Sequence, residues 1–132
     1  MTQRAPPKLL LIDDEPALAA YLAEAARMSG YKPLVAIDDQ DFKARLVAER
    51  PQMVALDLGM PGMDGVELLR FLADERFACP VLIISGFDRR VLESAFRLGE
   101  ALGLKMVGPL EKPTRLDDIA EILNALRPQL VS

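Results

Sequence analysis

Residues 57–65 of this chain are Asp-Leu-Gly-Met-Pro-Gly-Met-Asp-Gly, and an apolar run, residues 53–56, comes directly before them. Such a short, uninterrupted apolar run is typical of a buried parallel strand. A segment with helical periodicity, residues 66–73, follows. An acid at the end of a buried strand, followed by a Gly/Pro loop, lies where open α/β sheets bind their ligands, outside the carboxyl ends of the strands. Asp57 is therefore a candidate functional residue, although a lone acid in this position is more often a solvated turn residue.

The same alternation of strand and helix patterns extends along the chain in both directions. Strands are predicted at residues 9–12, 32–37, 53–56, 80–85 and 105–110, the last interrupted by a Gly-Pro pair. Helical periodicity follows each strand, and the apolar face of the fourth helix is predicted to consist of Val91, Ala95, Leu98 and Leu102. Five strands alternating with five helices indicate one parallel sheet with helices on both faces.

Two prolines predict the order of the strands. Pro33 and Pro109 fall inside the second and fifth strands, and proline in a sheet is confined to edge strands and strand starts. The first, third and fourth strands then form the centre, which agrees with the order 2-1-3-4-5 of a three-layer, doubly wound α/β fold of the flavodoxin-like type. In this order the chain reverses direction between strands one and three, and the crevice that opens there is flanked by Asp13, Asp14 and Asp57.

Length and composition indicate one domain and exclude several classes of function. We expect residues 1–7 to form a flexible arm, 8–127 the domain and 128–132 a tail. No apolar run is long enough to cross a membrane, and a net charge of −4 without basic runs argues against nucleic acid or an anionic membrane as a direct partner. The single cysteine, Cys79, fits a reducing cytoplasm, and the absence of histidine excludes Ser-His-Asp catalysis and His-ligated zinc.

Three carboxylates in one crevice need a cation that neutralises them or a proton that they share. At about 4 Å and an effective dielectric near 20, each pair of acids repels by roughly 4 kcal/mol. Magnesium suits such a site better than calcium, because it takes hard oxygen ligands and keeps several waters, and because the spacing is unlike a calcium-binding loop. The alternative is that Asp13 and Asp14 only cap the first helix. Ser85 at the end of the fourth strand and Lys112 after the fifth favour a functional site, because a hydroxyl, an ammonium and a divalent ion around one carboxylate can hold a tetrahedral dianion.

From about residue 8 to residue 126 the chain resembles the receiver domains of bacterial two-component response regulators, such as the chemotaxis response regulator. The resemblance rests on Asp13-Asp14, on Asp57 with the continuation Met-Pro-Gly-Met-Asp-Gly at 60–65, on Ser85-Gly86 and on Lys112-Pro113. The continuation after Asp57 is the most specific of these elements. The others are weak alone but occur in the right order.

The resemblance implies a phospho-accepting switch. In the family, the aspartate that matches Asp57 takes a phosphoryl group from a phosphohistidine on a sensor histidine kinase or a phosphotransfer protein. Magnesium would be bound directly by Asp14 and Asp57, through water by Asp13, and by the backbone carbonyl of Gly59.

Two further residues would act on the phosphoryl group itself. Ser85 would donate a hydrogen bond to it and Lys112 would pair with it, and the bond between Lys112 and Pro113 is expected to be cis. Such a protein is not an enzyme with an external substrate, since it catalyses only its own phosphorylation and dephosphorylation. The signal would leave through the face made by the fourth helix, the fifth strand and the fifth helix, where an output partner would bind.

The chain also departs from the family pattern. Pro109 stands where receivers often carry the Tyr or Phe that rotates inward on phosphorylation, so any signal must leave by movement of the backbone or a helix. The segment between Ser85 and Lys112 is several residues longer than in the chemotaxis protein, and we expect the extra length at residues 98–105. Residues 101–113 look like receivers found ahead of EAL-type cyclic-di-GMP phosphodiesterases. No such catalytic domain follows in this sequence, so we expect either a stand-alone receiver or a part of a larger protein.

Two other readings of the same residues remain open. The first is a pseudo-receiver, which would use the fold only to bind a protein and would not be phosphorylated. The second is a small phosphatase or a flavin-binding domain of similar topology. A phosphatase with an aspartate nucleophile would carry Asp-x-Asp after its first strand, whereas this chain has Asp13-Asp14-Glu15, and the loops lack the aromatic residues that sandwich a flavin.

Overall fold

The computed structural model describes residues 6–13, 15–58, 65–86, 89–112 and 115–127, without the side chain of Leu116. Within these segments strands and helices alternate strictly. In chain order the elements are β1 (Lys8–Ile12), α1 (Pro16–Met28), β2 (Lys32–Ala36), α2 (Asp39–Glu49), β3 (Met53–Asp57), α3 (Gly65–Asp74), β4 (Pro80–Ser85), α4 (Arg89–Ala101), β5 (Lys105–Glu111) and α5 (Leu116–Leu126). Residues 1–5 of the arm predicted at 1–7, and the tail predicted at 128–132, lie outside the described residues.

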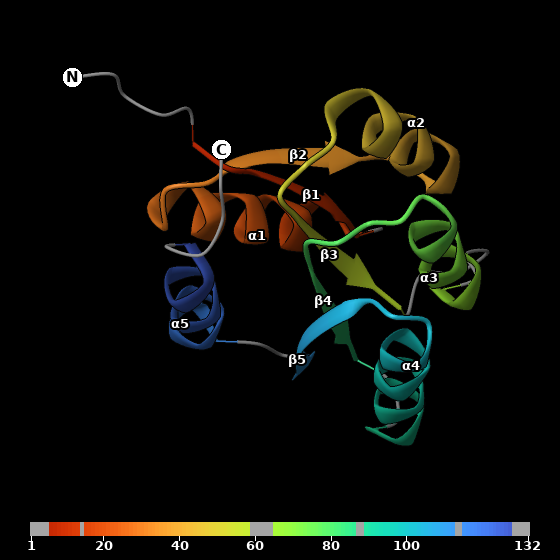
Figure 1. The fold of residues 1–132 in the computed structure, drawn as a ribbon. Helices are drawn as coiled ribbons and strands as arrows, with labels where there is room; N and C mark the ends of the chain where they lie inside the picture. The colour runs from red at the N-terminus through yellow and green to blue at the C-terminus, as the bar shows by residue number, and fades with distance from the viewer. Residues whose placement is uncertain (1–5, 14, 59–64, 87–88, 113–114, 128–132) are drawn as a thin grey trace.

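The five strands form one parallel sheet in the order β2-β1-β3-β4-β5, as predicted (Figure 1). Pro33 lies in β2 and Pro109 in β5, and both strands are edges. The prediction from proline is therefore confirmed, because an edge strand has one row of backbone groups that needs no partner. Helices α1 and α5 cover one face of the sheet, and α2, α3 and α4 cover the other (Figure 1).

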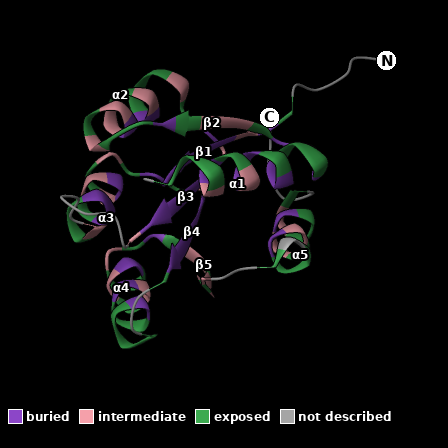
Figure 2. Ribbon diagram, turned by 180° about the vertical axis from the view of Figure 1, so that it is seen from behind, coloured by how far each residue is buried: buried purple, intermediate pink, exposed green. Residues whose placement is uncertain are grey.

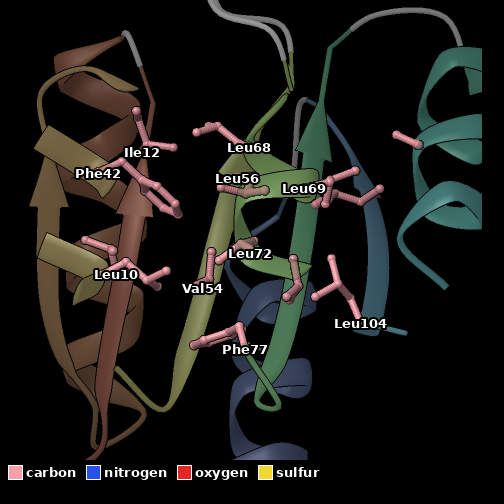
Figure 3. Packing of buried hydrophobic residues seen from close by; sticks show 14 of the residues in the cluster. Leu10, Ile12, Phe42, Val54, Leu56, Leu68, Leu69, Leu72, Phe77 and Leu104 are labelled. Atoms are coloured by element: carbon pink, nitrogen blue, oxygen red, sulfur yellow. The ribbon is translucent and has the colours of Figure 1, made fainter. Parts of the chain in front are cut away.

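Side chains of the central strands alternate between two apolar cores. Leu10 and Ile12 pack with α2, α3 and α4, in the core shown in Figure 3, whereas Leu9 and Leu11 pack with α1 and α5. We call these two sides the α3 face and the α1 face of the sheet. Every residue of β3 and β4 is buried, as Figure 2 shows from behind. Each fully buried Leu or Ile contributes about 1.5–3 kcal/mol to folding, so this apolar frame can hold polar groups at its edge.

Helix α4 packs largely through the predicted face, since Ala95 is buried and Leu98 and Leu102 pack against the α3-face core, but Val91 does not. Its buried residues are Leu92, Ala95 and Gly99, while Val91 is 53% exposed. Leu92 and Gly99 were not predicted to pack on the sheet, and the approach at Gly99 is close, because a Cβ there would lie 2.3 Å from the Sδ atom of Met106 in β5. A glycine therefore provides the contact with the sheet, and apolar periodicity does not count glycine as a core residue.

Strand β5 continues through the Gly-Pro pair at which an interruption was predicted. It pairs with β4 on both sides of the pair, with Leu82 opposite Val107 and Ile84 opposite Leu110. The peptide bond between Gly108 and Pro109 is cis. The bond between Lys112 and Pro113, which was predicted to be cis, lies outside the described residues. No helix in the described part of the chain is long and apolar enough to span a membrane.

Candidate functional site

Two of the predicted acids lie at the carboxyl ends of neighbouring central strands. Asp57 is the last residue of β3, and Asp13 directly follows β1. Each follows a residue on the α3 face, Leu56 and Ile12 respectively. Because side chains alternate along a strand, both acids belong to the α1 face. Both are buried, with 3% of Asp57 and 7% of Asp13 exposed.

Lys112 joins these two acids. Its Nζ atom lies 3.0 Å from Oδ2 of Asp57 and 3.1 Å from Oδ2 of Asp13. Its backbone N–H donates to the carbonyl of Ser85 over 2.8 Å, which fixes the end of β5 against β4. The lysine side chain is 14% exposed. Residues that are far apart along the chain thus form one charged cluster, which contains two carboxylates and one ammonium.

The pKa values of the cluster follow from burial and proximity. Burial raises the pKa of Asp13, and the charge of Asp57 raises it further. A hydrogen bond from the backbone N–H of Glu15 to Oδ1 of Asp13, 3.0 Å long, and the ammonium of Lys112 oppose this shift without cancelling it. Burial alone would lower the pKa of Lys112, but the hydrogen bond to Asp57 and the charges of Asp57 and Asp13 outweigh burial and raise it. The lysine therefore remains protonated at neutral pH.

The oxygen atoms of the cluster suit a hard cation. Oδ2 of Asp13 is fully buried and, within the described residues, accepts no hydrogen bond and meets only the ammonium of Lys112. Carboxylate oxygens with unused lone pairs are the ligands that magnesium prefers. Asp14 and Gly59, the other two predicted ligands, lie outside the described residues. Within the described ranges, no group of three His, Cys, Asp or Glu side chains forms a metal site.

Ser85 and Gly86 complete the described part of the crevice. Ser85, the last residue of β4, is fully buried, and β4 lies between β3 and β5 in the sheet. A Cβ on Gly86 would lie 3.5 Å from the Cβ of Lys112, in ordinary contact, so the lysine side chain runs close past this glycine. The structure therefore brings Ser85 and Lys112 to the same sheet edge as Asp13 and Asp57.

The sequence did not single out Glu15 as part of this cluster. Glu15 is the N-cap residue of α1 but makes no side-chain capping bond. Instead its Oε1 atom lies 3.7 Å from Nζ of Lys112, with 66% of its side chain exposed. An exposed acid at the start of a helix gives no sequence signal for such a contact, because many acids occur there for the helix dipole alone.

Comparison with known proteins supports this arrangement. Residues 9–124 match the model of the response regulator receiver domain family. The positive alginate biosynthesis regulatory protein of Pseudomonas aeruginosa is 32% identical over 127 residues, which are 93% of this chain and 48% of that protein. The chain spans about half or less of the length of the curated relatives it matches.

Solved structures show the same fold. A response regulator from Colwellia psychrerythraea is 26% identical, with a TM-score of 0.82 over 93% of this chain and 98% of that one. The receiver domain of the Francisella response regulator 1452, 24% identical, has a TM-score of 0.79 at the same coverage and shows the fold alone. Together with the family match and the acids at the ends of β1 and β3, they lead to one conclusion. The chain belongs to the response regulator receiver domain family of two-component systems.

Proposed function

We propose that this receiver accepts one phosphoryl group on Asp57, in a reaction that depends on magnesium, and that the change switches a partner or an output domain. The donor is a phosphohistidine on a sensor histidine kinase or a phosphotransfer protein. The observation that carries the proposal is the clamp of one ammonium, Lys112, between the buried carboxylates of Asp57 and Asp13. The protein has no external substrate and catalyses only the gain and loss of its own phosphoryl group.

The chemistry is an in-line displacement. A carboxylate oxygen of Asp57 attacks the phosphorus, the bond from phosphorus to the histidine nitrogen breaks, and its electron pair stays on the donor's imidazole. Asp13, Asp14, Asp57 and the carbonyl of Gly59 would hold magnesium, whose charge would neutralise the phosphoryl oxygens when bound. The repulsion between the two acids, and the buried Oδ2 of Asp13 that accepts no hydrogen bond from the described residues, support this assignment.

Lys112 and Ser85 then stabilise the product. The ammonium of Lys112 is already 3.0 Å from Asp57, so it can pair with a phosphoryl oxygen after a short movement. Ser85, at the end of the neighbouring strand, donates a hydrogen bond from its hydroxyl group to another phosphoryl oxygen. Fixed donors around developing charge are the main source of catalysis in such transfers.

The direct test is labelling with a small phosphodonor. The purified chain is incubated with acetyl phosphate and magnesium, and intact mass is measured. We expect the mass of one phosphoryl group to be added in the presence of magnesium. We expect no addition when a chelator removes the metal, and none in Asp57→Asn. Asp41→Asn, which removes an acid in α2 that pairs with Arg45 outside the cluster, is the matched control and should be labelled as the wild type is. Labelling that persists in Asp57→Asn would contradict the proposed acceptor, and repeated release of phosphate from small esters would favour a phosphatase.

One observation favours the pseudo-receiver as a second candidate. Pro109 occupies the position of the usual aromatic switch, half-buried in the edge strand β5, so the familiar route from the site to the output face is missing. Calorimetric titration with magnesium separates the two candidates. A receiver that is phosphorylated binds the ion, whereas a pure protein-binding module gives no heat of binding and no labelling.

A further inference from the structure

Strand β5 contains one residue more than its partner β4 requires. Before the Gly-Pro pair, Leu82 lies opposite Val107, and after it Ile84 lies opposite Leu110. One residue of β4, Ile83, therefore faces two residues of β5, Gly108 and Pro109. This arrangement is a β-bulge, which is rare between parallel strands and which is common beside active sites.

Packing on the two faces of the sheet confirms that the bulge changes the alternation of β5. Val107 and Leu110 both pack with the α1-face core, although they are three residues apart. In a regular strand, residues three apart point to opposite faces. The bulge thus resets which face each following residue belongs to.

The residues after the bulge are the ones that reach the site. Glu111 pairs with Arg89 of α4, with 3.5 Å between Oε1 and Nε. Lys112 turns the other way and meets Asp13, Asp57 and Glu15. In a strand without the bulge, Glu111 would take the place of Lys112 and point an acid at the two buried carboxylates, because a slip of one residue exchanges the faces.

We propose that Gly108 is a positioning residue for the phosphoryl-transfer site, because the bulge that it allows absorbs the one extra residue of β5, Pro109, and so aims Lys112, and not Glu111, at Asp13 and Asp57. The part of this inference that concerns phosphorylation rests on the proposed function. The part that concerns the position of Lys112 does not.

Gly108 is the residue that allows the bulge to form. Its φ of +87° is one that side-chain-bearing residues rarely adopt, and a Cβ there would lie 2.7 Å from Cδ1 of Leu82 and 3.3 Å from the backbone N of Leu110. A β-branched residue at this position disfavours the bulge on both grounds and favours a regular strand.

Three variants separate positioning from simple destabilisation. Gly108→Val should straighten the strand and displace Lys112. Deletion of Pro109 removes the extra residue itself, so the strand becomes regular with Lys112 still on the α1 face. The two changes together should therefore restore the site, since position 108 then needs no positive φ. Gly103→Val is the matched control, because Gly103 has a similar φ of +86° but a Cβ added there would meet no atom within 4 Å, and because it has no part in the bulge.

The position of Lys112 can be read without any phosphorylation. A zero-length carbodiimide crosslink joins Lys112 to the accessible Glu15, 3.7 Å away, and peptide mass spectrometry measures its yield. We expect the crosslink in the wild type, in the Pro109 deletion, in Gly103→Val and in the combined variant, and about a tenfold loss or more in Gly108→Val. The rate of labelling by acetyl phosphate should follow the same pattern, with a fall of about a hundredfold in Gly108→Val, as is usual for a displaced catalytic group.

The outcomes are distinct for the two proposals. A Gly108→Val chain that keeps the crosslink, a Pro109 deletion that folds without it or fails to fold, or a combined variant that does not recover it overturns the positioning inference. The deletion and the combined variant test the positioning inference even where Gly108→Val alone does not fold. Urea unfolding shows whether each variant folds. If the crosslinks follow the expected pattern while the wild type takes up no phosphoryl group, the positioning of Lys112 stands and the proposed function fails.

Discussion

At the level of single residues, the buried charge of Asp13 lowers the stability of the folded protein. Asp13 is a buried carboxylate beside a second one, and the two share a single lysine. Burial raises the pKa of Asp13 and the charge of Asp57 raises it further, and the ammonium of Lys112 does not cancel these effects. The arrangement makes sense if a cation is expected there, and natural sites commonly sacrifice stability in this way.

We expect Asp13→Asn to stabilise the metal-free protein. At pH 7 the free energy of unfolding should rise by about 1 kcal/mol, because the buried charge of Asp13 is gone while Lys112 keeps its ion pair with Asp57. The raised pKa sets the sign with pH. The folded protein binds the Asp13 proton more tightly than the unfolded chain does, so the penalty is present above the folded pKa and disappears as the pH falls through it towards 3.8. Urea unfolding in the presence of a chelator, at pH 7 and at a pH near 4, measures both effects.

Asp41 is a control for Asp13, because its pKa is shifted in the opposite direction. A hydrogen bond from the backbone N–H of Ile37 and the guanidinium of Arg45 lower the pKa of Asp41. Its contribution to stability is therefore present above 3.8 and is lost as the pH falls through the lowered folded pKa. Asp41→Asn should be less stable than the wild type at pH 7. A loss of stability in Asp13→Asn as well would show that the Lys112 pair outweighs the cost of burial.

The candidate site could be predicted from the sequence only as far as strand ends determine it. Asp13, Asp57, Ser85 and Lys112 each follow or end a predicted strand, and the carboxyl ends of parallel strands meet at one edge. Contacts made by long side chains were not predictable, as the ion pair of Glu15 with Lys112 shows. The extra length expected at residues 98–105, relative to the chemotaxis protein, stays a prediction.

At the level of elements, helix α4 depends on a close approach to β5. The helix packs through Leu92, Ala95 and Gly99, and Gly99 lies against Met106. Helix propensity alone predicts that alanine at position 99 stabilises the helix by about 1 kcal/mol. Packing predicts the opposite, because the Cβ would lie 2.3 Å from Sδ and 2.8 Å from Cγ and Cε of Met106.

We expect packing to decide the sign. Gly99→Ala should lower the free energy of unfolding by about 1 kcal/mol, the low end of the cost of overpacking a core. Met106→Ala in the same chain creates room for the new methyl group, so the combined variant should be more stable than the two separate losses predict. Urea unfolding of the three variants gives this coupling energy. A stabilised Gly99→Ala chain would show that Met106 moves aside freely and that α4 is not fixed to β5 at this point.

At the level of the whole molecule, the topology was predictable because several independent signals agreed. The apolar runs predicted the strands and the prolines predicted the two edges, and both agreed with the doubly wound order 2-1-3-4-5. The contact of Gly99 in α4 with β5 was not predictable, because apolar periodicity does not count glycine as a core residue. Nor was the way in which the last helix attaches to the rest of the fold, since the residues involved are far apart in the chain and belong to no motif.

That attachment is made by Tyr31 and Arg127. The hydroxyl of Tyr31, in the turn between α1 and β2, donates to the carbonyl of Leu123 in α5 over 2.7 Å. Nε of Arg127 donates to the carbonyl of Gly30 over 3.4 Å. Figure 1 shows α5 lying beside α1. Burial raises the pKa of Tyr31 to about 12, against the opposing charge of Arg127.

We expect Tyr31→Phe to cost about 1 kcal/mol of the free energy of unfolding at pH 7, the usual net value of one hydrogen bond. The raised pKa gives the dependence on pH. The unfolded chain loses the Tyr31 proton from about pH 10, whereas the folded protein holds it to about 12, so this part of the wild-type stability is present below pH 10 and is lost as the pH rises towards 12. The variant has no such proton, and the difference between the two proteins should shrink through that range. Urea unfolding followed by circular dichroism from pH 7 to about 11 tests this, with Tyr21→Phe in the half-buried part of α1 as the control. A difference that stays constant with pH would mean that the hydroxyl of Tyr31 is open to solvent in the folded protein and that α5 is held by its apolar face alone.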